Sequence, residues 1–238
     1  MRRFVADLHI HTCLSPCGGL DMAPRAIVAA ALNKGLDLIA ITDHNTCAMA
    51  ETVARVANAH GLAFLYGIEF QTAEEVHVLG YFDDAAHCRA AAAEAYSHLP
   101  DRRNDPLVFG DQVIVDEDET ILVFEPKLLV NSLSLDIEHV FHLIRNHGGL
   151  PVPAHVDREA FGIIAQLGFI PDNLQPALVE VAGKTVPCSL GDVAVLRSSD
   201  AHSLDEIGQR TTTIVLESIS VRELRWAAAG IDGRMILP

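Results

Sequence analysis

The sequence predicts an α/β fold in the form of one closed or nearly closed parallel barrel. Apolar runs bounded by turn residues alternate with helix-like stretches, and about seven such β-α units follow one another along the 238 residues. Neither a linker nor a break in composition interrupts this alternation, so we expect a single domain over 1–238. A doubly wound open sheet is the alternative fold.

The first β-α units lie in the N-terminal part of the chain. Gly35 and Gly61 follow helix-like stretches, where a left-handed residue closes a helix, and Pro24 suits the first turn of a helix. The predicted elements are, in order, a strand Arg3–His9, a helix Pro24–Lys34, a strand Leu36–Thr42, a helix Cys47–His60, a strand Leu62–Glu69, a strand Val76–Phe82 and a helix Ala85–His98.

The regular alternation lapses in the segment 101–130, which we interpret as an insertion. Two β-rich runs, Gln112–Val115 and Thr120–Phe124, flank the acidic turn Asp116–Glu119 and predict a β-hairpin. We expect this turn to be solvated, because carboxylates at a hairpin tip need no partner; binding of a cation is the alternative.

The β-α alternation resumes after this insertion. Ser220 and Glu223 have the spacing of a capping box, so the last helix is expected to begin near Ser220. Between the insertion and this last helix, the predicted elements are a helix Ser134–His147, a strand Leu150–Ala154, a helix Arg158–Leu167 and the strands Leu178–Val181, Val193–Ser199 and Thr212–Leu216.

The composition indicates a soluble protein with a substantial core, since 50% of its residues are hydrophobic. No apolar run is long enough to cross a bilayer, and no signal peptide follows Met1. The five cysteines are odd in number and scattered, which suits a reducing compartment better than a disulfide framework. We therefore expect a cytoplasmic protein without a membrane partner.

The charge balance is strongly acidic. Lysine and arginine number 17 against 32 acidic residues, and the formal charge of −15 would repel a long phosphate backbone. Long nucleic acid is therefore disfavoured as a partner. Bound divalent cations would reverse the sign locally, so a small phosphorylated ligand can still be attracted.

Metal-binding side chains stand at or near the ends of several predicted strands. His9 and His11 are two residues apart on an extended segment, so their imidazoles point to the same side. The full set is His9, His11, Asp43, His44, Glu69, His77, His155, Asp200 and His202. In parallel α/β folds the strand ends face one side, so we expect these residues to gather at one mouth of the barrel.

Imidazole and carboxylate ligands together favour zinc, manganese or iron(II) over calcium and magnesium, which prefer more oxygen. The donors exceed what one ion needs, and a carboxylate such as Glu69 can bridge two ions. Water held between two ions loses a proton near neutral pH and becomes a nucleophile. The predicted chemistry is hydrolysis by a metal-activated hydroxide, with Glu69, Asp200 and His202 as the catalytic residues.

These motifs, in this order, resemble the PHP (polymerase and histidinol phosphatase) family of metallohydrolases. The resemblance runs from residue 7 to about residue 208. It is carried by the segments Asp7–Thr12, Ile41–Asn45, Gly67–Glu69, Glu75–Tyr81, Ala154–His155 and Ser199–His202. It implies a distorted, TIM-like (βα)7 barrel and a phosphoesterase activity.

The resemblance also implies a di- or trinuclear centre of zinc, manganese or iron ions. The implied ligand sets are His9, His11, Glu69 and Asp200 for the first ion, Glu69, His77 and His155 for the second, and Cys17, His44 and His202 for the third.

Position 17 departs from the commoner pattern of the family, because Cys17 stands where many members have Asp or His. A thiolate binds zinc and softer ions well, so we expect Cys17 to keep the third site and to shift its metal preference. The alternatives are an empty or labile third site and a small buried apolar role for Cys17. That apolar role is expected for the remaining cysteines, Cys13, Cys47, Cys88 and Cys188.

Four further residues have predicted roles around the centre. Asp7 and Asp43 each stand close to a ligand histidine and are expected to orient an imidazole through a hydrogen bond. Direct ligation and bonding within the turn are the alternatives for both. Arg158 follows His155 closely, and its planar guanidinium fits a phosphate as well as a surface salt bridge. Lys184 is a second candidate for phosphate binding.

The sequence therefore predicts a metal-dependent phosphoesterase that acts on a small phosphorylated metabolite or nucleotide. One alternative is an exonuclease-like phosphodiesterase, which the charge of −15 disfavours. The other is a metal-binding regulatory protein without turnover, against which the full ligand set argues. The substrate, the choice between monoester and diester, and the oligomeric state do not follow from the sequence.

Overall fold

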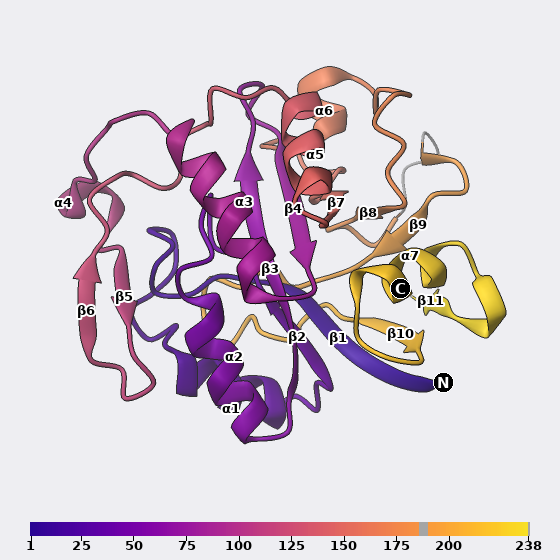
Figure 1. The fold of residues 1–238 in the computed structure, drawn as a ribbon, viewed down its shortest axis with the longest axis horizontal. Coiled ribbons are helices and arrows are strands. Elements are labelled where there is room, and N and C mark those ends of the chain that lie inside the picture. Colours follow the sequence, from indigo (N-terminus) through magenta and orange to yellow (C-terminus); the bar gives the residue numbers. More distant parts are fainter. Residues whose placement is uncertain (186–189, 238) are drawn as a thin grey trace.

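A curved sheet of seven strands forms the centre of the fold in a computed structural model that describes residues 1–185 and 190–237 (Figure 1). Its strand order is β11-β10-β1-β2-β3-β4-β7. The strands are β1 (Arg2–Ile10), β2 (Leu38–Ile41), β3 (Ala63–Gln71), β4 (His77–Phe82), β7 (Leu150–Pro153), β10 (Thr212–Leu216) and β11 (Met235–Leu237).

This sheet is mixed rather than parallel. β1, β2 and β3 pair in parallel, but β4 is antiparallel to both β3 and β7, and β10 is antiparallel to β1. Only residues 72–76 join β3 to β4, and so short a connection cannot hold the crossover that parallel strands need. The mixed α/β class is confirmed, whereas the expectation of a wholly parallel barrel is wrong.

A small parallel sheet lies between the two edges of the large one. It consists of β8 (Leu178–Glu180) and β9 (Ala194–Leu196), with β8 beside β7 and β9 beside β11. Both sheets contribute to one enclosed apolar cluster that includes Phe4, Leu38, Leu65, Leu79, Leu178, Leu196 and Ile214. The sheets therefore curl around a common core in the manner of a barrel.

Helices surround these sheets (Figure 1). They are α1 (Pro24–Asn33), α2 (Ala50–Ala59), α3 (Ala85–Ser97), α4 (Pro106–Phe109), α5 (Ile137–Asn146), α6 (Ile163–Leu167), α7 (Val221–Ala228) and the short 3-10 helix η2 (Ile231–Gly233). Within the described part of the chain, no helix has both the length and the apolar character that crossing a bilayer requires.

The predicted helix boundaries are largely reproduced. Gly35 and Gly61 follow α1 and α2 with φ of 73° and 72°, the left-handed conformation that glycine favours. Ser220 caps α7 by accepting a hydrogen bond from the N–H of Glu223 at 3.2 Å. The reciprocal half of a capping box is absent from the described contacts, because the Glu223 carboxylate accepts from Arg234 and from the N–H of Glu217 instead. α6 is shorter than expected, and α4, η2 and β11 are not predicted.

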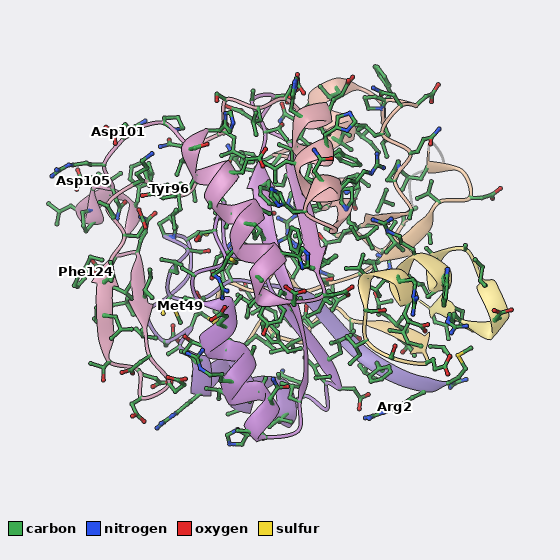
Figure 2. All side chains as sticks on the ribbon, in the orientation of Figure 1. Arg2, Met49, Tyr96, Asp101, Asp105 and Phe124 are labelled. Atoms are coloured by element: carbon green, nitrogen blue, oxygen red, sulfur yellow. The ribbon has the colours of Figure 1, made fainter. Side chains whose placement is uncertain are left out.

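The segment 101–130 holds an antiparallel pair, β5 (Val113–Val115) and β6 (Ile121–Phe124), at the margin of the fold beside α4 (Figure 1). Phe124 is 60% exposed on β6, and Tyr96 of α3 faces this margin (Figure 2). The Tyr96 hydroxyl donates to the Glu125 carboxylate at 2.7 Å and so ties the pair to α3.

The acidic turn of this pair is exposed but has partners. Asp118 pairs with Arg25 of α1, and Glu117 pairs with Arg55 of α2. The Glu119 carboxylate also accepts the backbone N–H of Arg25 at 3.1 Å. The turn is solvent-exposed as expected, but two helices present arginine side chains to it, so its carboxylates are not without partners.

Candidate metal centre

The predicted metal-binding side chains meet at one end of the curved sheet. His9 lies near the end of β1, Glu69 lies near the end of β3, and His44 follows β2. His155 follows β7, and Asp200 and His202 follow β9. His77 opens β4, and the antiparallel register pairs it with Gln71 at the end of β3. The first residue of β4 therefore lies beside the last residues of β3.

The buried carboxylate of Glu69 is the centre of this cluster. The imidazole nitrogens that lie 2.8–3.4 Å from its two oxygens belong to His9, His11, His44, His77 and His155. Burial by itself raises the pKa of Glu69, but the neighbouring imidazoles outweigh burial and hold this pKa well below its usual range. A carboxylate so surrounded can contribute to more than one ion site.

The first predicted ligand set is assembled. The ligand atoms of His9, His11, Glu69 and Asp200 all lie within 4.8 Å of one another, and all four residues are buried. The Asp200 Oδ1 atom lies 3.1 Å from His9 Nε2 and 3.2 Å from His11 Nε2. Burial opposes a charged imidazolium at His9, but Asp200, Glu180 and Glu69 outweigh it and raise the pKa of His9 well above its usual value.

A β-bulge in β1 directs the two histidines to this cluster. The register between β1 and β2 shifts between Asp7 and Ile10. Leu8 packs in the enclosed core, whereas Ile10 packs outside with residues of α1 and α2. Bulges re-aim side chains in this way and are common beside active sites.

The second ligand set contains a histidine that was expected elsewhere. His44, Glu69 and His77 have ligand atoms within 4.8 Å of one another. His155, the predicted member of this set, has its Nε2 atom 3.3 Å from Glu69 Oε1. Both histidines therefore stand beside the same carboxylate.

The third group contains the predicted Cys17, His44 and His202, together with His11. The Cys17 Sγ atom lies 3.3 Å from His44 Nε2, and the ring of His202 stacks on that of His11 at 4.3 Å. Desolvation, followed by the charge of Glu69, raises the pKa of the Cys17 thiol well above its usual value. Metal binding at this thiol would therefore release a proton.

Cys17 is exposed, so the alternative of a buried apolar role is wrong for it. The same role is confirmed for Cys13, Cys47 and Cys88, which are buried, while Cys188 lies outside the described residues.

Unpartnered polar atoms test whether these residues fit metal ions. Among the described residues, Glu69 Oε2 and the Nδ1 atoms of His44, His77 and His155 are buried without a hydrogen bond. Yet His44 Nδ1 and His77 Nδ1 lie only 3.0 Å and 2.8 Å from oxygens of Glu69. Buried polar groups normally have a partner, and donors this close without hydrogen-bond geometry are expected of ligands that share a cation. The donor set fits zinc, manganese or iron ions.

Glu180 contacts the ring of one ligand histidine and the backbone of another. Its carboxylate accepts from His9 Nδ1 at 3.0 Å and from the backbone N–H of His155 at 3.0 Å. A proton held at Nδ1 leaves the lone pair of His9 Nε2 free for a cation. Glu180 was not predicted as a site residue; its one signal in the sequence is a lone glutamate inside the apolar run Leu178–Val181.

Asp43 acts on His11 through Ser15 rather than directly. It accepts hydrogen bonds from the Ser15 hydroxyl at 2.7 Å and the Thr12 N–H at 2.8 Å. Since the single hydroxyl hydrogen of Ser15 goes to Asp43, its oxygen accepts from His11 Nδ1 at 2.9 Å. The expected orienting role therefore passes through one intermediate hydroxyl.

Asp7 touches no imidazole among its described hydrogen bonds. Its carboxylate accepts the backbone N–H groups of Ser199 at 3.0 Å and Gly208 at 2.8 Å. Burial raises the pKa of Asp7 to about 6. These bonds are neither the predicted imidazole contact nor bonds within the turn that follows Asp7, because the bulge turns Asp7 toward the distant loop that carries Asp200.

Two ligands have strained backbones. His155 and Asp200 have φ of 26° and 54°, a region that residues with a Cβ rarely adopt. Such strain persists where the surrounding structure holds it, and it is concentrated at functional sites.

A cleft of about 300 Å³ opens beside the cluster. Arg158 and Phe161 line it together with several ligands, and Arg158 Nη1 lies 2.6 Å from Asp200 Oδ2. The Phe161 ring stacks on His77 at 4.4 Å. Lys184 does not line this cleft, and instead lines a separate one with Arg197.

Comparison with known proteins identifies related sequences. The PHP domain model matches residues 7–149. An uncharacterized protein of Methanocaldococcus jannaschii is 35% identical over 85 residues, which cover 32% of this chain and 49% of that protein. The chain therefore spans about half the length of the curated relative it matches.

Solved structures share the fold. The lesion-specific endonuclease Q of Pyrococcus furiosus has a TM-score of 0.73 at 17% identity, over 99% of this chain and 58% of its own. A protein named as a metal-dependent phosphoesterase from Bifidobacterium adolescentis has a TM-score of 0.58 at 21% identity, and the match covers 83% of this chain and 87% of that protein. An amidohydrolase from Chromobacterium violaceum has a TM-score of 0.58 at 18% identity, and the match covers 86% of this chain and 90% of that protein.

Proposed function

The chain belongs to the PHP family, and from that premise we propose that it is a metal-dependent hydrolase of phosphate esters. The observation that carries this proposal is the buried Glu69 carboxylate with five imidazoles around it, open to a cleft that Arg158 lines. When bound, divalent ions would supply Lewis-acid charge and lower the pKa of a water molecule.

The proposed ligand sets keep the grouping found above. The first is His9, His11, Glu69 and Asp200, the second is Glu69, His77 and His155 with His44 beside them, and the third is Cys17, His44 and His202 with His11. Burial, and then the positive field of His11, lowers the pKa of His202 to about 4, so this imidazole is neutral at pH 7, as ligation requires. Its Nδ1 atom lies 2.9 Å from the Asp200 carbonyl oxygen and donates to it, which leaves Nε2 as the basic atom.

The proposed role of Arg158 is to hold the phosphate. Its side chain is 38% exposed and contacts Asp200 through Nη1. The remaining N–H groups of a guanidinium can bind phosphate oxygens in the fork geometry that arginine provides. A cleft of about 300 Å³ suits a small phosphorylated metabolite or nucleotide.

A metal-dependence assay tests the proposal. The chain is freed of metal with a chelator, reloaded with zinc, manganese or iron(II), and assayed on p-nitrophenyl phosphate, bis(p-nitrophenyl) phosphate and a panel of nucleotides. We expect metal-dependent hydrolysis that Glu69→Ala abolishes and that substitution of the exposed Glu159 by Gln leaves intact. Stoichiometric metal binding without turnover on any substrate would contradict the proposal and favour a regulatory protein.

A second candidate is cleavage of phosphodiester bonds in DNA. The chain shares its fold with endonuclease Q, one structure of which holds a duplex with an abasic lesion at its active site. The formal charge of −15 disfavours a long polymer only on average over the surface. Degradation of labelled oligonucleotides, compared with release of phosphate from monoesters, separates the two candidates.

A further inference from the structure

A second cleft, of about 390 Å³, is rich in positive charge. Its lining consists of Ala182, Gly183, Lys184, Arg197 and Arg210. Within residues 1–185 and 190–237, no carboxylate oxygen pairs with any of these three cations within 4.0 Å. In a chain with a formal charge of −15, three such cations in one cleft form a local reversal of sign.

Backbone carbonyl groups hold the two guanidinium groups in place. Arg197 donates to the carbonyl oxygens of Gly183 and Lys184, the latter at 3.1 Å. Arg210 donates through Nε to the carbonyl oxygen of Ser198 at 3.0 Å and through Nη2 to that of Ser199. Carbonyl groups fix the planar groups without cancelling their charge, so the cleft is prepared for an anion.

The cationic cleft adjoins the metal centre. The Ser199 carbonyl that Arg210 contacts immediately precedes the ligand Asp200. Asp157 accepts the backbone N–H of Ala182 at 2.8 Å, at the cationic cleft, while the next residue, Arg158, lines the metal cleft. Consecutive residues therefore connect the two clefts at the same end of the fold.

We propose that the cleft of Lys184, Arg197 and Arg210 binds a phosphate group other than the one at the metal centre. Phosphate binding in this cleft does not depend on the proposed function. Its consequence does rest on that function, and it is that the substrate carries a further phosphate beside the scissile one. The phosphate can come from such a substrate or from the free ion, and the chemistry of recognition is the same for both.

Binding to the metal-free chain tests the proposal independently of catalysis. The probes are inorganic phosphate, measured by calorimetry, and a labelled single-stranded thymidine octanucleotide, measured by fluorescence anisotropy over a salt series. Lys184 is exposed, so Lys184→Gln is expected to fold; Lys34→Gln, at the exposed end of α1, is the matched control. Thermal unfolding of both variants verifies the fold.

We expect Lys184→Gln to weaken phosphate binding. For the octanucleotide, we expect the slope of log K against log salt to become shallower by about 0.7, the effect of losing one phosphate contact on a single strand. Weakening seen with the octanucleotide alone assigns the cleft to a substrate phosphate, and weakening with inorganic phosphate alone assigns it to the free ion. The proposal is overturned if Lys184→Gln and Lys34→Gln both bind each probe with the affinity of wild type. Absence of hydrolysis by the metal-loaded wild type would instead contradict the proposed function.

Discussion

Replacement of Glu180 by glutamine tests whether orientation of His9 sets metal affinity. The Glu180 carboxylate accepts from His9 Nδ1 and from the backbone N–H of His155. In glutamine an NH2 group replaces one of the two oxygens. His9 Nδ1 lies 3.2 Å from Oε1 and 3.0 Å from Oε2, so the ring N–H faces that NH2 group in either orientation of the amide. The negative charge that favours a proton at His9 Nδ1 is also lost.

The expected magnitude follows from these contacts. Hydrogen bonds to charged groups contribute about 1.5–3 kcal/mol each, and loss of a partner that orients a metal ligand lowers metal affinity by about 10–100-fold. That factor corresponds to about 1.4–2.7 kcal/mol in the free energy of metal binding. Glu180→Gln should therefore bind the first ion about 10–100-fold more weakly than wild type.

The assay is competition between the chain and a chelating indicator for zinc or manganese, with bound ions counted by elemental analysis. The exposed Glu159→Gln provides the matched control. Thermal unfolding in excess chelator separates weaker binding from a damaged fold. Metal affinities of Glu180→Gln and Glu159→Gln that both equal wild type would refute the orienting role of Glu180.

Three further predictions address the third ion, the support of His11 and acid stability. Cys17→Ser should lower the bound metal by about one ion per chain under mild chelation, because a serine hydroxyl is a poorer ligand than a thiolate; elemental analysis measures this. Ser15→Ala should lower the free energy of unfolding of the metal-free chain in urea by about 1–3 kcal/mol, since it removes the buried partner of His11 Nδ1 and one hydrogen bond of Asp43, which keeps those of Thr12. The Arg234 hydrogen bonds lower the pKa of Glu223 from 4.5 to about 2, so its contribution to stability is present above pH 4.5 and is lost as pH falls toward 2. Glu223→Gln should flatten the fall in melting temperature over that range.

Each of these predictions has an outcome that contradicts it. An unchanged ion count in Cys17→Ser would remove the thiol from the third group. Urea curves of Ser15→Ala that superimpose on wild type would mean that water replaces the hydroxyl. A melting temperature that falls with acid as steeply in Glu223→Gln as in wild type would assign acid unfolding to other carboxylates.

Parts of the centre were predictable because they depend on local geometry. His9 and His11 are two residues apart at the end of β1, Glu69 lies near the end of β3 and Asp200 follows β9, so the first ligand set follows from alternation and topology. Glu180 was not predictable in the same way. It stands alone in an apolar strand, and its partner His9 lies 171 positions earlier, so only the folded chain reveals the contact.

Asp7 and Asp43 show that closeness in sequence to a ligand histidine does not predict which groups a carboxylate contacts. Each stands close to a ligand histidine, and the same role was expected for both. The bulge in β1 turns Asp7 to the backbone of Ser199 and Gly208, whereas Asp43 reaches the Ser15 hydroxyl. A bulge depends on the pairing of β1 with β2, which composition and spacing in β1 alone do not determine.

The direction of β4 explains why the predicted ligands meet although the sheet is mixed rather than parallel. In a parallel arrangement, the first residue of a strand lies at the end opposite to the ligands. Because the short connection 72–76 reverses the chain, His77 pairs with Gln71 and its Nδ1 atom lies 2.8 Å from Glu69. β7 runs antiparallel to β4, which returns the chain to the same end and places His155 there. Two reversals of direction thus bring a strand start and a strand end to one carboxylate, so insertion of residues into 72–76 should displace His77 before it affects His155.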